Sequence, residues 1–343
     1  MMTAHLLLEA PIALTPVLIF FGALLYLDSY SLVSFREVAA TLLAGVLLCW
    51  AALEVNGFAI AYLHLDFTTY SQKIAPIIEE SLKASALIYL FARNRIGFVI
   101  DAAIMGFSVG AGFALIENIY LLYAFPQAGL GVWLIRGFGT AVMHSGATAL
   151  FAMLAQWLIE RRMRPIALAF APALAAAIGV HMTFNLLGSS PLAATAVLLF
   201  VCPVGFVLVF SKSEDAVHKW LLSDYENHQH LLDSIKNDTF TGTEAGRILG
   251  GLADKLAPER LKDIVTYMQI HTELVLRAEK LSLARESGEK LSVTRDDETR
   301  FRQMRSLERR IGRTTLMTIR RHMHFSRREL WELNELKGEL WRV

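Results

Sequence analysis

Residues 98–124 read FVIDAAIMGFSVGAGFALIENIYLLYA, and this apolar stretch decides the fold class. A helix of this length can cross the hydrocarbon core of a bilayer, which needs about 20 mostly apolar residues. Gly106, Gly110, Phe113 and Glu117 follow a spacing of i, i+4, i+7 and i+11, which places them on one helical face. Small residues on such a face let another helix approach closely. We therefore predict a transmembrane helix that carries Glu117 into an interface between helices.

Six further apolar stretches predict that the chain crosses the membrane about seven times. They lie at residues 11–27, 38–63, 74–91, 131–159, 166–187 and 191–210. No Lys or Arg precedes the first stretch and more spans follow it, so we expect a retained helix rather than a cleaved signal peptide. The predicted fold class is all-α, a polytopic membrane helix bundle.

Charge divides the chain into two regions. Residues 1–210 hold 9 of the 33 Lys and Arg residues and 10 of the 32 Asp and Glu residues, which leaves 24 and 22 for residues 211–343. This distribution excludes a disordered chain, a disulfide scaffold and a purely cytosolic enzyme. We predict a membrane domain at residues 1–210 and a cytoplasmic helical region at residues 211–343.

The loops between the predicted spans alternate between basic and non-basic. The basic set contains Arg36, Arg93, Arg95, Arg161, Arg162, Arg164 and the charged tail, whereas the other set contains only Lys73. Short cytoplasmic loops of membrane proteins carry an excess of Lys and Arg. We therefore predict a multi-pass protein of the cell membrane with its N-terminus outside and its C-terminus in the cytoplasm.

Four of the predicted spans carry ionisable residues, which are costly in a bilayer and are functional candidates for that reason. Glu80, Glu117 and His181 each lie roughly 9 Å from the outer end of their helices, counting 1.5 Å per residue. His144 lies roughly 12–20 Å from that end, depending on where Arg136 meets the interface. We therefore expect carboxylates and imidazoles to meet in the outer half of the bilayer.

Other polar residues of the spans are expected to support this group. Lys83 lies one turn from the adjacent pair of glutamates in its span and can compensate their charge. Arg136, Thr140 and His144 are spaced by four residues, which predicts a single polar stripe on a regular α-helix. Asp101 lies near the cytoplasmic end of its span, where we expect a structural role.

The motifs in these four spans resemble those of the PrsW-like family of glutamic-type intramembrane proteases. They occur in the same order, as Glu79-Glu80-x-x-Lys83, Phe113-x-x-x-Glu117-Asn118, His144 and His181-x-x-x-Asn185. The resemblance covers about residues 70–190. The broader superfamily includes the CAAX-prenyl endopeptidases, which usually have a His where this chain has Glu117 and an Arg after the glutamate pair. That difference favours the PrsW-like branch.

The resemblance implies a transmembrane protease domain at residues 1–210 that acts within the lipid bilayer. Its substrates would be membrane-anchored proteins, in some members of the family an anti-sigma factor whose cleavage starts a signalling cascade. Such a protease would belong to the bacterial inner membrane.

Peptide hydrolysis needs an activated water, a proton donor and oxyanion stabilisation, and these needs select the predicted catalytic set. The set consists of Glu79, Glu80, Glu117, His144, His181, Asn118 and Asn185. We expect Glu80, with Glu79 beside it, to activate the water. The two histidines would orient this water or pass its proton, and the two asparagines would donate hydrogen bonds to the oxyanion. Glu117 would hold a second carboxylate role or fix a histidine. The sequence does not separate Glu79 from Glu80, since neighbours differ by about 100° around a helix.

Two other interpretations stay open from the sequence. Two Glu and two His side chains can form a zinc site with an open position for water, although the chain has no HExxH motif. We predict no cofactor and keep a zinc-dependent membrane protease as the alternative. A proton- or cation-coupled transporter would use the same acids, but it predicts inverted repeats, and the sequence shows no internal repeat.

The charged tail is predicted to be a regulatory region that binds a cytoplasmic protein partner. Pro258 suits the first position of a helix, and residues 286–299 are predicted to break helical structure. Ten arginines between Arg300 and Arg328 predict contact with anionic lipid headgroups. No recognition motif accompanies these arginines, so we expect no nucleic-acid partner.

Overall fold

The chain was examined as a computed structural model. It describes residues 2–26, 33–161, 165–237, 239–243, 246–247, 249–250, 258–287, 289, 291–312, 315–316 and 327–340. The chain divides into two compact units, Met1–Glu214 and Asp215–Val343. The functional labels predicted for the two regions, a protease domain and a partner-binding region, remain predictions.

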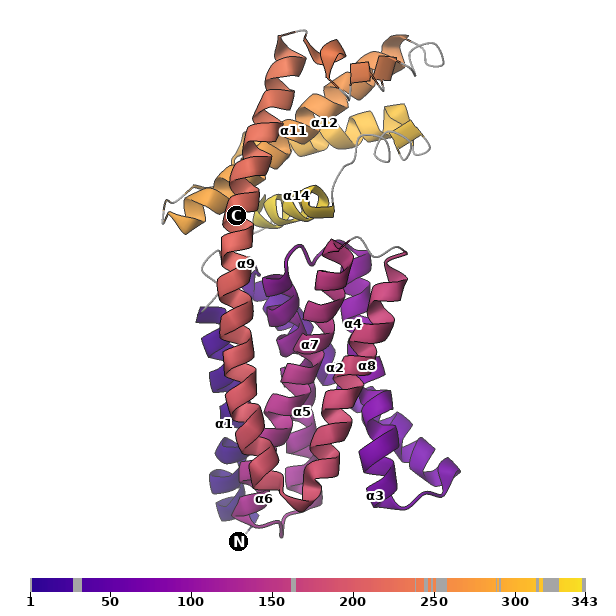
Figure 1. The fold of residues 1–343 in the computed structure, drawn as a ribbon, viewed down its shortest axis with the longest axis vertical. Coiled ribbons are helices and arrows are strands. Elements are labelled where there is room, and N and C mark those ends of the chain that lie inside the picture. Colours follow the sequence, from indigo (N-terminus) through magenta and orange to yellow (C-terminus); the bar gives the residue numbers. More distant parts are fainter. Residues whose placement is uncertain are drawn as a thin grey trace. The chain divides into compact units, whose positions relative to one another are not determined.

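The first unit is a bundle of long helices that run alongside one another (Figure 1). Its elements are α1 (Met2–Tyr26), α2 (Phe35–Leu63), α3 (Phe67–Thr69), η1 (Tyr70–Ile74), α4 (Ala75–Ala92), α5 (Val99–Ala124), α6 (Leu130–Ile135), η2 (Arg136–Thr140), α7 (Ala141–Glu160), α8 (Ala167–Leu186) and η3 (Leu187–Ser189). Helix α9 (Pro191–Lys236) begins in this unit and continues into the second. The described residues contain no strand, which confirms the all-α fold class.

Six helical segments are long and apolar enough to cross a membrane. They are Leu8–Tyr26, Phe35–Leu63, Val99–Ala124, Leu130–Glu160, Ala167–Leu186 and Pro191–Lys212. These segments correspond to six of the seven predicted stretches and confirm a polytopic membrane bundle.

The seventh predicted stretch, residues 74–91, forms the 18-residue helix α4 but is too polar to count as an apolar span. The reason is its three charged residues, Glu79, Glu80 and Lys83. All three side chains are buried, with 7%, 2% and 0% of their residue surface exposed. Neighbouring helices therefore cover the charged face of α4.

Helix α5 packs against α7 on one face and against α2 on another. The close approach of α7 depends on Gly106 and Gly110, as the small-residue spacing predicted. A Cβ atom at Gly110 would lie 2.5 Å from the Cα of Ser145 and 2.6 Å from the carbonyl oxygen of His144. Because a Cβ cannot approach backbone atoms so closely, glycine is required where α5 passes the His144 segment.

A π-helical segment, η2, separates α6 from α7 within one span. Its last hydrogen bond runs from the Ala141 N–H to the Arg136 carbonyl, five residues back. The sequence predicted Arg136, Thr140 and His144 as one polar stripe on a regular α-helix, and the structure places a π turn at residues 136–140 of that stripe. Single π turns inside helices are frequent at functional sites.

The second unit contains the C-terminal part of α9, η4 (Phe240–Gly242), α11 (Pro258–Glu286), α12 (Arg295–Ile311) and α14 (Arg327–Leu340). Apolar residues of α11, α12 and α14 form its core, among them Ile264, Leu274, Phe301 and Leu336. The predicted span ended at residue 210, whereas helix α9 continues to Lys236. Its second half is polar, so apolar length did not predict it.

Helix α11 begins at Pro258, as predicted. The predicted break at residues 286–299 is shorter, because α12 already begins at Arg295. Thr294 caps this helix, and the Asp297 carboxylate accepts a hydrogen bond from the Thr294 N–H at 2.7 Å. Within the arginine-rich stretch, residues 313–314 and 317–326 lie outside the described residues.

Candidate active site

Glu80 and Lys83 form a buried ion pair on α4. Lys83 Nζ lies 2.6 Å from Glu80 Oε1, and the two side chains are 0% and 1% exposed. Lys83 Nζ also lies 3.1 Å from His144 Nδ1 and 4.8 Å from the centre of the Phe113 ring. A buried ammonium needs a carboxylate partner because its desolvation is otherwise uncompensated. Glu80 therefore serves as the counter-ion of Lys83.

Glu117 on α5 links the π-helical segment to His144. Arg136 donates through Nη2 to Glu117 Oε2 at 2.7 Å and through Nε to Asn118 Oδ1 at 2.9 Å. His144 Nε2 lies 3.2 Å from the same Oε2 atom. The Glu117 side chain is 20% exposed, compared with 9% for Glu79 and 1% for Glu80.

The carboxylate partners of the two histidines indicate which ring nitrogen carries the proton. An ionised carboxylate only accepts hydrogen bonds, so the nitrogen that faces it carries N–H. In His144 this nitrogen is Nε2, which faces Glu117, and in His181 it is Nδ1, which lies 2.8 Å from Glu80 Oε1. The His144 Nδ1 lone pair then faces the Lys83 ammonium at 3.1 Å, and the His181 Nε2 lone pair is available as an acceptor or metal ligand.

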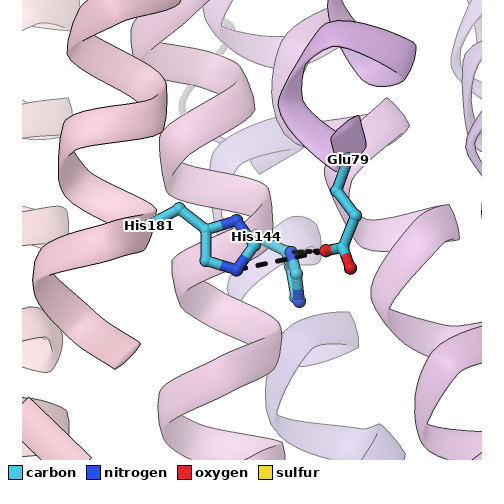
Figure 2. A group of neighbouring side chains, drawn as sticks. All are labelled: Glu79, His144 and His181. Carbon is cyan, nitrogen blue, oxygen red and sulfur yellow. Dashed lines mark ion pairs between the residues drawn. The ribbon is translucent and has the colours of Figure 1, made fainter. Parts of the chain in front are cut away.

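His144 and His181 each turn a ring nitrogen toward Glu79 (Figure 2). Glu79 Oε2 lies 4.0 Å from His144 Nδ1 and 4.0 Å from His181 Nε2. The two imidazole rings stand nearly perpendicular, with centroids 4.7 Å apart. Figure 2 shows the three side chains pointing toward one another from three separate helices. The fold thus assembles one carboxylate and two imidazoles from α4, α7 and α8 around one point.

Glu79 differs from the other two carboxylates in its charge partners. Lys83 neutralises Glu80, and Arg136 neutralises Glu117. Within the part of the chain that the structure describes, no Lys or Arg lies within ion-pair distance of Glu79; its polar contacts are with an amide and two imidazoles. Glu79 therefore differs from Glu80 and Glu117 in having only neutral-type partners, an amide and two imidazoles, among the described residues.

Two residues outside the predicted set complete the surroundings of Glu79. Asn56 on α2 donates from Nδ2 to Glu79 Oε1 at 3.0 Å, and Tyr70 donates from its hydroxyl to Asn56 Oδ1 at 2.8 Å. Asn56 lies in the predicted span at residues 38–63, and a polar amide in an apolar span is a feature that the sequence alone shows. Its partner could not be identified without knowing that α2 faces α4.

Asn118 and Asn185, expected as oxyanion donors, each hold a backbone carbonyl. Asn118 Nδ2 donates to the Ala13 carbonyl at 2.8 Å, and Asn185 Nδ2 donates to the Ser71 carbonyl at 2.9 Å. These hydrogen bonds link α5 to α1 and α8 to η1. One N–H of each amide is thus engaged in fixing helices around the site.

Four further residues of the membrane unit are not part of this group of contacts. Asp101 accepts hydrogen bonds from the Gly97 and Phe98 N–H groups at 2.9 and 3.1 Å, a structural role at the start of α5. Glu54 is exposed on α2. Cys49 and Cys202 are both unpaired thiols.

A comparison with known protein families identifies the chain. The model of the family described as PrsW family intramembrane metalloprotease matches residues 34–211, more than half of the 343 residues. The chain belongs to this family. As a PrsW-family member it is an intramembrane protease, a hydrolase of peptide bonds, and the matched region contains every residue of the cluster. Searches among curated proteins and solved structures found no match.

The PrsW family description names a metalloprotease, so the predicted glutamic type is not confirmed. The donor set of the cluster suits a metal ion. Glu79, His144 and His181 offer one oxygen and two nitrogens within 4.8 Å of one another, which are zinc-ligand types. Each imidazole also donates its other N–H to a carboxylate, as metal-binding histidines usually do.

The distances within the same set also suit a water molecule. Ligand atoms of a tetrahedral zinc ion lie roughly 3.4 Å apart, given bonds of about 2.1 Å. Groups that share one hydrogen-bonded water lie roughly 4.5 Å apart, given hydrogen bonds of about 2.8 Å. The two distances of 4.0 Å from Glu79 fall between these values.

Proposed function

We propose that this chain is an endopeptidase that cleaves membrane-anchored protein substrates with a water molecule activated by Glu79. The observation that carries the proposal is the meeting of Glu79 Oε2 with two imidazole ring nitrogens at 4.0 Å, on the one carboxylate of the site without a described cationic partner. The sequence favoured Glu80 as the base, with Glu79 beside it. The contacts favour Glu79, since Glu80 is held between Lys83 and His181.

In this proposal each side chain handles a defined proton. A water bound beside Glu79 donates one hydrogen bond to the His181 Nε2 lone pair and the other to Glu79 Oε2, and it transfers the second proton to Glu79. Its oxygen bonds to the scissile carbonyl carbon, and the carbon–nitrogen bond then breaks. The protonated Glu79 gives its proton to the leaving amine. A carboxylate in a low-dielectric site suits this role because desolvation strengthens it as a base.

The other residues of the predicted set act here by positioning. Glu117 and Glu80 hold the two imidazoles in the tautomers that direct their lone pairs inward. Asn118 and Asn185 fix the helices that carry these groups. Lys83 and Arg136 keep Glu80 and Glu117 ionised by supplying the opposite charge.

A metal ion, as the family description implies, would be held by Glu79, His144 and His181. Such an ion would polarise the scissile carbonyl and make the attacking water more acidic. Under either chemistry Glu80 and Glu117 hold the same ring protons.

The proposed side of cleavage follows from the charge of the loops between the spans. With basic loops in the cytoplasm, the cluster lies in the outer half of the bilayer, so we propose cleavage of single-span proteins near their extracytoplasmic end. A role in regulated proteolysis, with a substrate like an anti-sigma factor, belongs to the same proposal. Cysteine accessibility labelling of the two termini tests the orientation.

The test is cleavage of single-span substrates by the full chain in proteoliposomes. Glu79→Gln keeps the shape of the side chain and removes the base, so we expect a loss of about 10²- to 10⁴-fold in rate. Glu54→Gln is the matched control, because Glu54 is an exposed glutamate of another span. Full cleavage by Glu79→Gln would contradict the proposal.

A second arm separates the two chemistries. Water activation by Glu79 alone predicts activity that survives dialysis against a chelator. Activity that is lost in chelator and returns with zinc would instead assign Glu79 as a metal ligand. Either result keeps the peptidase assignment, whereas the absence of cleavage of any single-span protein under both conditions would remove it.

A further inference from the structure

A second group of ionisable side chains lies in the second unit, apart from the protease residues. Asp224 and His228 are four residues apart on α9 and therefore share one face of that helix. His228 Nδ1 lies 2.8 Å from Oε1 of Glu279 on α11. Ligand-type atoms of Asp224, His228 and Glu279 all lie within 4.8 Å of one another. Two facing helices thus present one imidazole and two carboxylates to a common point.

Glu332 on α14 adds a carboxylate with no hydrogen bond to this group. Its residue surface is 1% exposed, and neither of its carboxylate oxygens has a hydrogen-bond partner within the described part of the chain. The same holds for Oε2 of Glu279, whose side chain is fully buried. Buried carboxylate oxygens are almost always satisfied by a donor or a cation. Two such groups in one place indicate a missing ligand.

The charges of Glu279 and Asp224 act on Glu332, which places its carboxylate near this group. Burial, followed by the charges of Glu279, Glu329 and Asp224, raises the pKa of Glu332 well above its usual value. Burial alone lowers the pKa of His228, but its hydrogen bond to Glu279 and the nearby carboxylates raise it overall. Negative charge therefore exceeds positive charge here.

Glu329 has a partner of its own, since its Oε2 lies 3.9 Å from His271 Nδ1. Glu332 thus remains the carboxylate of α14 whose oxygens are unsatisfied. Helices α9 and α11 supply the ligand-type atoms of the group, as in metal sites built within helix bundles, and α14 supplies the buried carboxylate near it.

We propose that Asp224, His228 and Glu279 bind one divalent transition-metal ion in the second unit, with the buried Glu332 carboxylate near them. The ion takes the place of the proton between His228 and Glu279, provides a partner for Glu279 Oε2, and balances the negative charge of the group. One imidazole with two carboxylates suits zinc or manganese, since imidazole is a poor ligand for magnesium and calcium.

The experiment measures metal stoichiometry on the full chain in detergent. To isolate this site, the substitutions Glu79→Gln and His181→Gln first remove donors of the membrane cluster. In that background we expect one equivalent of zinc by equilibrium dialysis and elemental analysis, with manganese competing and magnesium not competing. His228→Gln and Glu279→Gln should each weaken zinc binding by about 10- to 100-fold or more, the range seen even for outer-shell partners of metal ligands.

Glu226→Gln is the matched control, because Glu226 is an exposed glutamate of α9 between Asp224 and His228. It should bind zinc as the background protein does. No zinc bound in the background protein, or equal binding after His228→Gln, would overturn the proposal and leave protons as the occupants of the group.

The comparison is repeated without the background substitutions, where loss of His228 must lower the zinc stoichiometry by one. Circular dichroism and size-exclusion chromatography establish that each variant is folded. Because the readout is bound metal, this result is independent of whether the membrane cluster cleaves peptides.

Discussion

His144 Nε2 lies 3.2 Å from Glu117 Oε2, and this contact sets the tautomer of the histidine that faces Glu79. Glu117 is itself fixed by Arg136, which donates to the same oxygen at 2.7 Å from the π-helical segment. The wider π turn and the imidazole are thus connected through one carboxylate.

The first prediction concerns Glu117→Gln. A glutamine amide has no charge to hold Arg136 and can donate to His144 as well as accept from it, so the inward lone pair of His144 is no longer enforced. We expect kcat/KM in proteoliposomes to fall by about 10- to 100-fold, the range for outer-shell partners of site histidines. Unchanged kcat/KM would show that the Glu117–His144 contact does not orient the imidazole.

The second concerns Lys83→Met. Removing one partner of a buried ion pair leaves the other as an uncompensated charge, at a cost of about 3–5 kcal/mol in the free energy of unfolding. Chemical unfolding in micelles measures this loss. The double variant Lys83→Met/Glu80→Gln should recover much of it, because neither charge remains. A double variant no more stable than Lys83→Met would contradict the assignment of Glu80 as the counter-ion.

The third concerns Gly110→Ala. The added methyl group meets backbone atoms of Ser145 and His144, so α5 and α7 must separate where the site is held. Overpacking of this kind costs about 1–3 kcal/mol. Gly22→Ala is the control, since a Cβ there meets nothing within 4 Å. Thermal melting that is equally affected by both substitutions would remove the argument from helix approach.

The fourth concerns Asn56, which no motif indicated. Asn56→Leu removes the hydrogen bond to Glu79 Oε1, worth about 0.5–1.5 kcal/mol, so we expect a loss of about 2- to 10-fold in kcat/KM. Tyr70→Phe leaves that hydrogen bond and removes only the one that orients the amide, so its effect should be smaller. A larger effect of Tyr70→Phe would mean that Tyr70 acts on the substrate directly.

Much of the fold could be predicted because a chain that crosses a lipid bilayer as helices needs long apolar segments. Apolar length alone located the six membrane-crossing segments, and the spacing of Gly110 and Glu117 located the face of α5 that meets α7. The same reasoning counted α4 as an apolar span, although its charged residues depend on neighbouring helices for burial.

The residues of the cluster could also be named from sequence, but their division of roles could not. Glu79 and Glu80 are adjacent and chemically identical. What separates them is that Lys83 and His181 hold Glu80, while Asn56 and two imidazole ring nitrogens face Glu79. Apart from Lys83, which lies on α4 itself, these partners come from α2, α7 and α8, and sequence spacing carries no information on how separate helices turn toward one another.

The buried ion pair of Glu80 and Lys83 on α4 has a consequence for membrane insertion. A charged residue near the middle of a helix raises the free energy of membrane insertion by about 2.5–3.5 kcal/mol, and α4 carries three within five positions. As an isolated segment α4 would remain in the translocation channel or at the lipid surface. We therefore expect its insertion to be delayed until α5 and α7 have been synthesised, so that the membrane integration of α4 coincides with the assembly of the cluster around Glu79.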